Sequence, residues 1–138
     1  EIIISANEKQ EFKTDLKIVI DSQYNEGPLR GLVDTLNATK AERMLLLAVD
    51  LPNMPINFLG ELIYSGCGTI PVHKNGMTEP LAAVYPKSLI KFAEKNLKLG
   101  ILKMQTFTAQ AIEEGFLKER PIKDSEIPFF ENLNYPNI

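Results

Sequence analysis

One stretch, LLLAVDLP at residues 45–52, joins a continuous apolar run to a single carboxylate. Five apolar residues in a row are typical of a strand that is buried on both faces of a parallel sheet. Pro52 and Pro55 prevent the strand from continuing. Asp50 is therefore predicted at the carboxyl end of a strand, the edge where open α/β sheets bind ligands. A carboxylate there suits Mg²⁺, although Asp50 as a cap of the next helix is the alternative.

Strand-like and helix-like segments alternate along the rest of the chain. Helical spacing of apolar residues predicts helices at 28–36, 55–66, 87–98 and 102–114. Short apolar runs predict strands at 2–5, 17–20, 44–49, 68–72, 81–85 and 121–123. Asn75-Gly76 is a turn signal, so strands 68–72 and 81–85 are expected to form a hairpin. The sequence therefore predicts an α/β fold, a Rossmann-like and mostly parallel sheet with helices on both faces and an antiparallel hairpin strand.

Composition restricts the classes of function. The 138 residues suit one domain, and their net charge of −3 without a Lys/Arg cluster argues against nucleic-acid binding. One cysteine and one histidine exclude a Cys/His zinc site and an intrachain disulfide. No apolar run approaches the ~20 residues that span a bilayer. We therefore expect neither a nucleic-acid nor a membrane partner.

Polar side chains follow three of the predicted strands. Asn7 comes after the first, Asp21 after the second and Asp50 after the third. The carboxyl ends of parallel strands lie at one edge of a sheet, so we expect these three residues to converge on a shared groove. Taken singly, Asn7 is also a common helix cap and Asp21 a common turn residue.

The segment GPLRG at residues 27–31 opens the helix that follows the second strand. The first turn of a helix offers free backbone N–H groups and a positive dipole end, which suit phosphate. Gly27 and Gly31 allow a ligand to approach the backbone closely. Arg30 is either a partner for phosphate oxygens or a solvated side chain.

Four segments together carry a resemblance to a known family. They are GPLRG at 27–31, DLP at 50–52, EPLAAVY at 79–85 and FENLNYP at 130–136. In order and spacing they resemble the molybdenum cofactor guanylyltransferases across nearly the whole chain. The resemblance implies a nucleotide-diphospho-sugar transferase-like fold. It also implies transfer of GMP from GTP to molybdopterin cofactor, with release of pyrophosphate and with Mg²⁺.

The resemblance also implies roles for single residues. Asp50 matches the catalytic, metal-binding carboxylate, and Asp21 matches the aspartate that contacts the guanine nucleotide. Gly31 matches the glycine that closes the nucleotide-side loop. Asn132 and Asn134 match an Asn-x-Asn element near the pterin. Together with Gly27 and Asn7, which the residues themselves suggested, these positions form the expected site.

Residues 1–138 do not include the family's glycine-rich loop with its Arg and Lys. That loop belongs to a strand–loop–helix unit expected before Glu1, and without it we expect little activity. GTP and molybdopterin are the expected partners, with molybdoenzymes or other cofactor-synthesis proteins, in the cytoplasm. A cytidylyltransferase or sugar-phosphate nucleotidylyltransferase of the same fold is the close alternative. A non-catalytic homologue and a receiver-like signalling domain are alternatives of another class.

Overall fold

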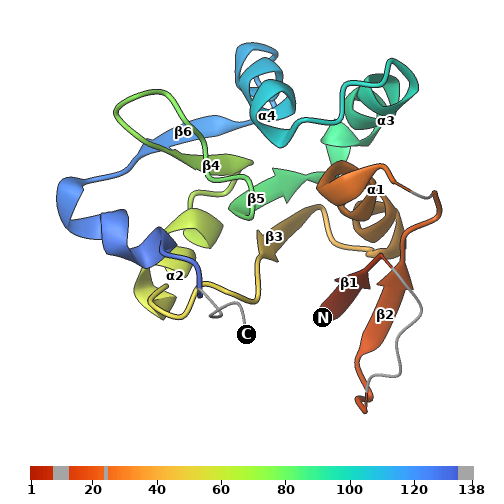
Figure 1. Ribbon diagram of the computed structural model, residues 1–138, viewed down its shortest axis with the longest axis horizontal. Helices are drawn as coiled ribbons and strands as arrows, with labels where there is room; N and C mark the ends of the chain where they lie inside the picture. The colour runs from red at the N-terminus through yellow and green to blue at the C-terminus, as the bar shows by residue number, and fades with distance from the viewer. Residues whose placement is uncertain (8–12, 24, 134–138) are drawn as a thin grey trace, which may run out of the picture.

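The computed structural model describes residues 1–7, 13–23 and 25–133 (Figure 1). Its helices are α1 (Gly27–Ala38), α2 (Ile56–Tyr64), α3 (Ile90–Lys98) and α4 (Met104–Glu113), with 3-10 turns η1 (Lys87–Leu89) and η2 (Asp124–Phe130). Its strands are β1 (Ile3–Ala6), β2 (Lys17–Ile20), β3 (Arg43–Leu47), β4 (Thr69–Val72), β5 (Ala82–Pro86) and β6 (Lys118–Pro121). Within these residues no helix combines the length and the apolar character needed to cross a membrane.

The strands form two sheets. β1 and β2 pair in parallel, and the other four are ordered β3-β5-β4-β6. β4 and β6 are parallel, whereas β5 runs antiparallel to both of its neighbours. The predicted α/β fold with an antiparallel strand is confirmed. The antiparallel share is larger than expected, because β5 lies between β3 and β4 and opposes each of them.

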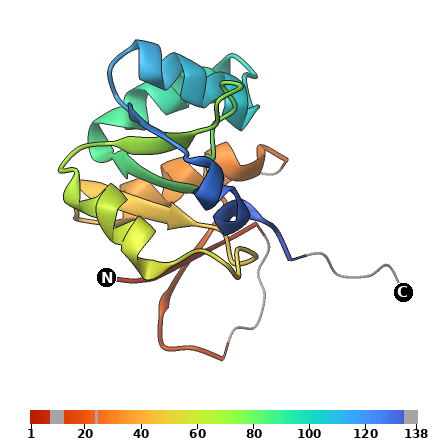
Figure 2. The same cartoon turned by 90° about the vertical axis from the view of Figure 1, so that its left-hand side faces the viewer.

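β5 separates the two hydrophobic cores of the domain. Ala83 and Tyr85 face a core built with α1, α3 and α4. Ala82 and Val84 face a second core built with α2 and η2. Side chains alternate between the faces of a strand, so a strand buried on both sides is apolar throughout. Figure 2 shows α4 and α2 on opposite sides of the four-stranded sheet, as the sequence predicted.

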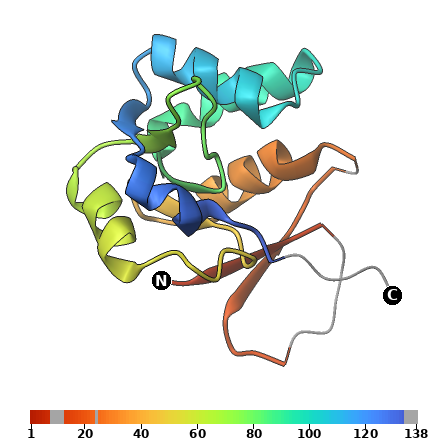
Figure 3. The same ribbon diagram turned by 60° about the vertical axis from the view of Figure 1, so that its left-hand side comes forward.

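α1 packs on both sheets. Its four predicted core residues are almost completely buried; they are Leu29, Leu32, Val33 and Leu36. The helix contacts β1 and β2 as well as β3, and Figure 3 shows it beside the β1–β2 pair. Within the described residues, β1 pairs only with β2 and β3 only with β5. One edge of β1 and one edge of β3 are therefore unpaired on the side where α1 joins the two sheets.

Two predicted strand boundaries are wrong. β3 ends at Leu47, two residues before the predicted end, because Val49 and Asp50 form a turn. Pairing with the β5 side continues for one more residue, since the Ala48 N–H donates to the Leu81 carbonyl at 2.8 Å. The last strand occupies 118–121 and not 121–123, because the ladder with β4 selects Lys118–Pro121 despite its charged residues.

Arg120 fastens the C-terminal part of the chain to the sheet. Its Nη2 donates to Glu61 of α2 at 3.1 Å and to Glu126 of η2 at 2.8 Å. Its guanidinium also lies over the ring of Phe58, 4.8 Å from the centroid. Hydrogen bonds from Arg120 lower the pKa values of both Glu61 and Glu126. One side chain thus ties β6, α2 and η2 together.

We expect Arg120→Met to lower the free energy of unfolding by about 2 kcal/mol, because it leaves the half-buried Glu126 without its cation. A carboxyl with a lowered pKa in the folded state stabilises the fold above its ordinary pKa and loses that contribution as pH falls. The difference between wild type and variant should therefore shrink in acid. Urea unfolding at pH 7 and pH 3 measures it, with the exposed Lys118→Met as control. An equal loss at both pH values would contradict the account.

Candidate functional site

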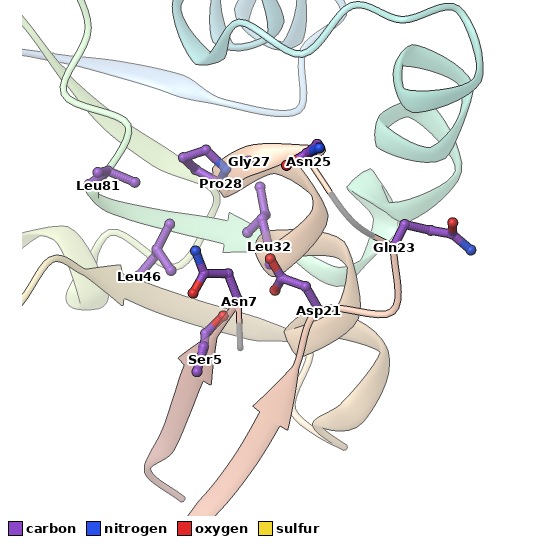
Figure 4. Close-up of a pocket in the computed structure, with 12 residues that line it drawn as sticks. Ser5, Asn7, Asp21, Gln23, Asn25, Gly27, Pro28, Leu32, Leu46 and Leu81 are labelled. Atoms are coloured by element: carbon purple, nitrogen blue, oxygen red, sulfur yellow. The ribbon is translucent and has the colours of Figure 1, made fainter. Parts of the chain in front are cut away.

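A cavity of about 580 Å³ lies beyond the ends of β1 and β2 (Figure 4). α1 and its preceding turn form one wall, and β3 and the segment before β5 contribute apolar groups. The residues that line it are Ser5, Ala6, Asn7, Asp21, Gln23, Asn25, Gly27, Pro28, Gly31, Leu32, Leu46 and Leu81. Four residues predicted from the sequence, Asn7, Asp21, Gly27 and Gly31, therefore line this first cavity together.

The β1–β2 register places Asn7 beside Asp21. Ala6 pairs with Ile20 at the last position of the ladder. The Asp21 N–H then donates to the Ala6 carbonyl at 2.9 Å, which carries the pairing one residue further. Figure 4 shows the side chains of Asn7 and Asp21 on the α1 side of the strand ends. Polar side chains thus converge here because two parallel strands stop at the same level.

Gly31 allows α1 to lie against these strand ends. A Cβ at this buried position would come within 2.9 Å of Ser5 Oγ and 3.3 Å of Asp21 Oδ1. The first distance is shorter than van der Waals contact permits, so a larger residue would displace Ser5. The sequence predicted a close approach at Gly31 by a ligand. The structure brings two side chains of the protein itself there, at the wall of the cavity.

Asp21 sits in an environment that disfavours its charge. Partial burial and the nearby carboxylate of Asp34 raise the pKa of Asp21, and Arg30 acts weakly in the other direction. Arg30 pairs with Glu26 at 2.9 Å and with Asp34 at 3.5 Å. The cation at Arg30 is therefore engaged in ion pairs within α1. The sequence left Arg30 as either a phosphate partner or a solvated side chain, and the structure shows it largely buried in these ion pairs.

The turn before α1 and the first residues of the helix line the first cavity. Asn25 and Gly27 have positive φ angles of 60° and 63°. Glu26 occupies the N-cap position without a side-chain hydrogen bond to the helix. Gly27 has no neighbour within 4 Å of a Cβ position, so the space beside it is open. An uncapped helix start in a cavity wall is suited to an anion.

A second cavity of about 450 Å³ contains Asp50 and Asn132. Their neighbours come mainly from the segment between β4 and β5. The residues that line it are Ala48, Asp50, Leu51, His73, Asn75, Met77, Thr78, Glu79, Pro80, Leu81, Gln105 and Asn132. Leu81 lines both cavities, so the two adjoin. Asn7 and Asp21 therefore line one cavity, and Asp50, in the turn after β3, lines the adjoining one.

Asp50 does not cap α2. That helix starts at Ile56, and Pro55 occupies its N-cap position without any side-chain hydrogen bond. The Asp50 carbonyl accepts the Leu133 N–H at 2.8 Å. Its half-buried carboxylate makes no hydrogen bond or ion pair with the residues that the structure describes. The carboxylate is thus available to a ligand of the second cavity.

The C-terminal segment reaches the second cavity through a packed aromatic pair. Phe129 and Phe130 of η2 meet the ring of Phe58 edge to face, with centroids 5.8 and 5.5 Å away. This packing and the Leu133–Asp50 hydrogen bond position Asn132 beside Asp50. Asn134 lies outside the described residues.

The sequence did not single out four polar residues of the second cavity. Gln105 of α4 bonds Thr78 in both directions, at 2.8 to 3.0 Å. His73 bonds Glu79 at 2.7 Å. The EPLAAVY segment pointed to Glu79 only as part of a motif. Nothing in the spacing of His73 or Gln105 indicated a site, because a turn and a distant helix bring them together.

Comparison with known proteins gives one family. Residues 1–113 match the MobA-like NTP transferase domain. A protein of Clostridium perfringens strain 13, named "Probable molybdenum cofactor guanylyltransferase", is 32% identical over 97% of this chain and 71% of its own length. A protein of the same name from Opitutus terrae is 29% identical over 98% of the chain and 69% of its own length. These matches confirm the resemblance predicted from the sequence.

Two solved structures share the fold. A protein from Aquifex aeolicus VF5 superimposes with a TM-score of 0.78 at 20% identity, covering 96% of this chain and 70% of its own. Molybdopterin-guanine dinucleotide biosynthesis protein A from Archaeoglobus fulgidus gives 0.70 at 24% identity, covering 90% and 65%. At these identities the likeness supports the fold alone.

The raised pKa of Asp21 predicts a gain in stability when its charge is removed. A carboxyl whose pKa is raised by folding favours the folded state below its ordinary pKa and opposes it as pH rises through the folded value. Asp21→Asn should therefore raise the free energy of unfolding at pH 7 by about 0.5 kcal/mol. The gain should disappear at pH 3. A variant that is less stable than wild type at pH 7 would contradict the assigned environment.

Proposed function

Because the chain belongs to the MobA-like NTP transferase domain family, we propose that it transfers GMP from GTP to molybdopterin cofactor and releases pyrophosphate. The observation that carries the proposal is the pair of cavities that adjoin at Leu81. A transfer between two substrates needs two binding sites in contact. The first cavity suits the nucleotide and the second suits the acceptor.

The first cavity has the chemistry that a guanine nucleotide requires. A carboxylate accepts hydrogen bonds from the N1–H and N2–H groups of guanine, and Asp21 is a partly desolvated carboxylate in the wall. Cytosine offers one donor beside an acceptor on the same edge, so it satisfies such a carboxylate less well. Asn7, Gly27 and Gly31 then contact the nucleotide, whose phosphates meet the open start of α1. We therefore favour GTP over CTP.

Asp50 suits a magnesium ion shared with substrate. Mg²⁺ is usually held by one or two carboxylates together with substrate phosphates and waters. No group of three His, Cys, Asp or Glu side chains that would hold a metal is found within residues 1–7, 13–23 and 25–133. A single available carboxylate fits the first kind of site and not an all-protein cage. Bound there, Mg²⁺ would neutralise phosphate charge.

The reaction asks little proton chemistry of the protein. A phosphate oxygen of the acceptor attacks the α-phosphorus of GTP. The new P–O bond forms as the bond from that phosphorus to the bridging oxygen breaks, and pyrophosphate leaves. The nucleophile is already an anion, so no general base is needed, and catalysis rests on alignment. Asn132, with Asn134 beyond it, would bind the pterin end of the acceptor.

We also propose that a glycine-rich strand, loop and helix complete this domain. The edges of β1 and β3 that no described strand pairs with support it, since the unpaired N–H and C=O groups of a strand edge attract another strand. A parallel strand between them would deliver its loop to the first cavity, beside the open start of α1. That loop would then make most of the contacts to the triphosphate. GTP and molybdopterin, the proposed substrates, place the enzyme in the cytoplasm in this proposal. Molybdoenzymes or other cofactor-synthesis proteins would receive its product.

Asp50→Asn should abolish Mg²⁺-dependent transfer, measured in protein that carries the glycine-rich unit. Its free energy of unfolding should stay within about 1 kcal/mol of wild type, because the carboxylate bonds none of the residues that the structure describes. Asp124→Asn, an exposed aspartate elsewhere, is the matched control and should keep full activity. Retained transfer in Asp50→Asn would refute the metal assignment.

Gly31→Ala should weaken GTP binding by at least about tenfold, because the added Cβ displaces Ser5 and crowds Asp21. Stability should change by less than about 1 kcal/mol, since helix propensity offsets part of the strain. Gly60→Ala is the matched control, because its Cβ would meet only Tyr64 at 3.8 Å in α2. Calorimetric titration with GTP and with CTP measures both effects. Equal losses in the two variants, or tighter CTP binding, would contradict the proposal.

A further inference from the structure

His73 and Glu79 face each other across a turn. β4 ends at Val72, and the chain reverses through hydrogen bonds from the His73 N–H to Met77 at 2.8 Å and from the Gly76 N–H to His73 at 2.9 Å. The Glu79 N–H then bonds the Pro71 carbonyl at 2.9 Å. This backbone pairing brings Nε2 of His73 to 2.7 Å from Oε1 of Glu79.

The imidazole of His73 is held on a second side by Phe130 of η2. The ring of Phe130 meets it edge to face, with centroids 5.8 Å apart and planes at 68°. Phe130 is itself buried against α2. The His73 side chain keeps 23% of its surface exposed and lines the second cavity with Asp50. Its position is therefore fixed before any ligand arrives, and its surface is still accessible.

The charges of the second cavity leave His73 a distinct role. Of its described lining residues, Asp50 and Glu79 carry carboxylates, and His73 is the one that can become a cation. The neighbouring cations are engaged elsewhere: Lys74 pairs with Asp124, and Arg120 pairs with Glu61 and Glu126. An anionic acceptor that enters this cavity thus meets one side chain able to balance its charge.

The pairing with Glu79 also determines which ring nitrogen is available. Nε2 donates to the carboxylate, and Nδ1 has no hydrogen-bond partner within the described part of the chain. When both nitrogens carry protons, Nδ1–H is a charged donor. Charge-assisted hydrogen bonds to phosphate are among the strongest that side chains make.

We propose that Nδ1–H of His73 binds the phosphate of the acceptor substrate, with Glu79 as the residue that positions the ring. This rests on the proposed function and deepens it, since it assigns the anchor of the phosphate group that attacks the nucleotide. His73 then binds the phosphate of the acceptor in the cavity that Asp50 also lines. Asn132, which lines the same cavity, is left for the pterin.

His73 is the sole histidine of the sequence, which makes it its own reporter. Its Cε1–H resonance in a carbon–proton correlation spectrum needs no assignment. Saturation with a pterin that carries a phosphomonoester side chain should shift this resonance. The same pterin without the phosphate, and GTP with Mg²⁺, should leave it nearly unchanged. An equal shift with the dephosphorylated pterin, or an equal shift with GTP and Mg²⁺ in the absence of the pterin, would overturn the proposal.

Variants separate binding from fold. His73→Gln and Glu79→Ala should each lower the affinity for the pterin phosphomonoester by about tenfold, because one charged hydrogen bond is lost. Neither variant should change the affinity for GTP. Glu79→Gln keeps a partner for Nε2 and should lose less. Glu79→Ala should also change the ring-carbon shifts that report the His73 tautomer. Lys74→Gln, an exposed neighbour, is the control. An equal loss of affinity for GTP would mean that His73 and Glu79 have a general structural role, and it would refute the assignment.

Binding of the pterin itself distinguishes two kinds of failure. Pterin fluorescence records whether the phosphomonoester binds at all. If it binds and the His73 resonance does not move, His73 is not the anchor and the proposed transferase reaction stands. If neither the phosphomonoester nor the free pterin binds, the acceptor assignment fails and this inference fails with it.

Discussion

The close contact of α1 with the ends of β1 and β2 is the constraint on which the rest of the site depends. Gly31 permits it, because a Cβ there would lie 2.9 Å from Ser5 Oγ. The contact brings the open start of the helix, Asp21 and Asn7 to one cavity. The same helix packs on β3, whose following turn carries Asp50 to the adjoining cavity. Gly31 thus helps to determine how the first cavity lies relative to the carboxylate of Asp50.

This arrangement explains how charge is distributed across the proposed reaction. The raised pKa of Asp21 reflects a carboxylate kept in a partly dry site near Asp34, a cost in stability that a hydrogen-bonding ligand would relieve. On the other side of Leu81, the Asp50 carboxylate bonds no side chain in the described part of the chain, and His73 is held by Glu79 and Phe130. The tail that provides Phe130 is anchored in turn by Arg120. The ion pairs of Arg120, which lie outside the cavities, therefore help to hold Phe130 and His73 in place.

Local pattern was sufficient for much of this. The helical spacing of Leu29, Leu32, Val33 and Leu36 predicted their burial, and the carboxyl-end rule predicted that Asn7 and Asp21 would meet. The apolar run predicted a strand that continues to Val49, directly before Asp50. This end was wrong, since the end of β3 depends on pairing with β5 and not on the apolar run itself. The charged segment 118–121 became a strand for the same reason, because the ladder with β4 outweighs its composition. His73 and Glu79 meet through a turn and a tail that no periodicity reveals.

The most direct measurement is the structure of the protein with a non-hydrolysable GTP analogue and Mg²⁺. The account predicts the guanine beside Asp21 in the first cavity, with the α-phosphate turned toward Leu81 and the second cavity left to the acceptor. A nucleotide whose base occupies the cavity of Asp50 and His73, or one that lies away from Gly31, would contradict it.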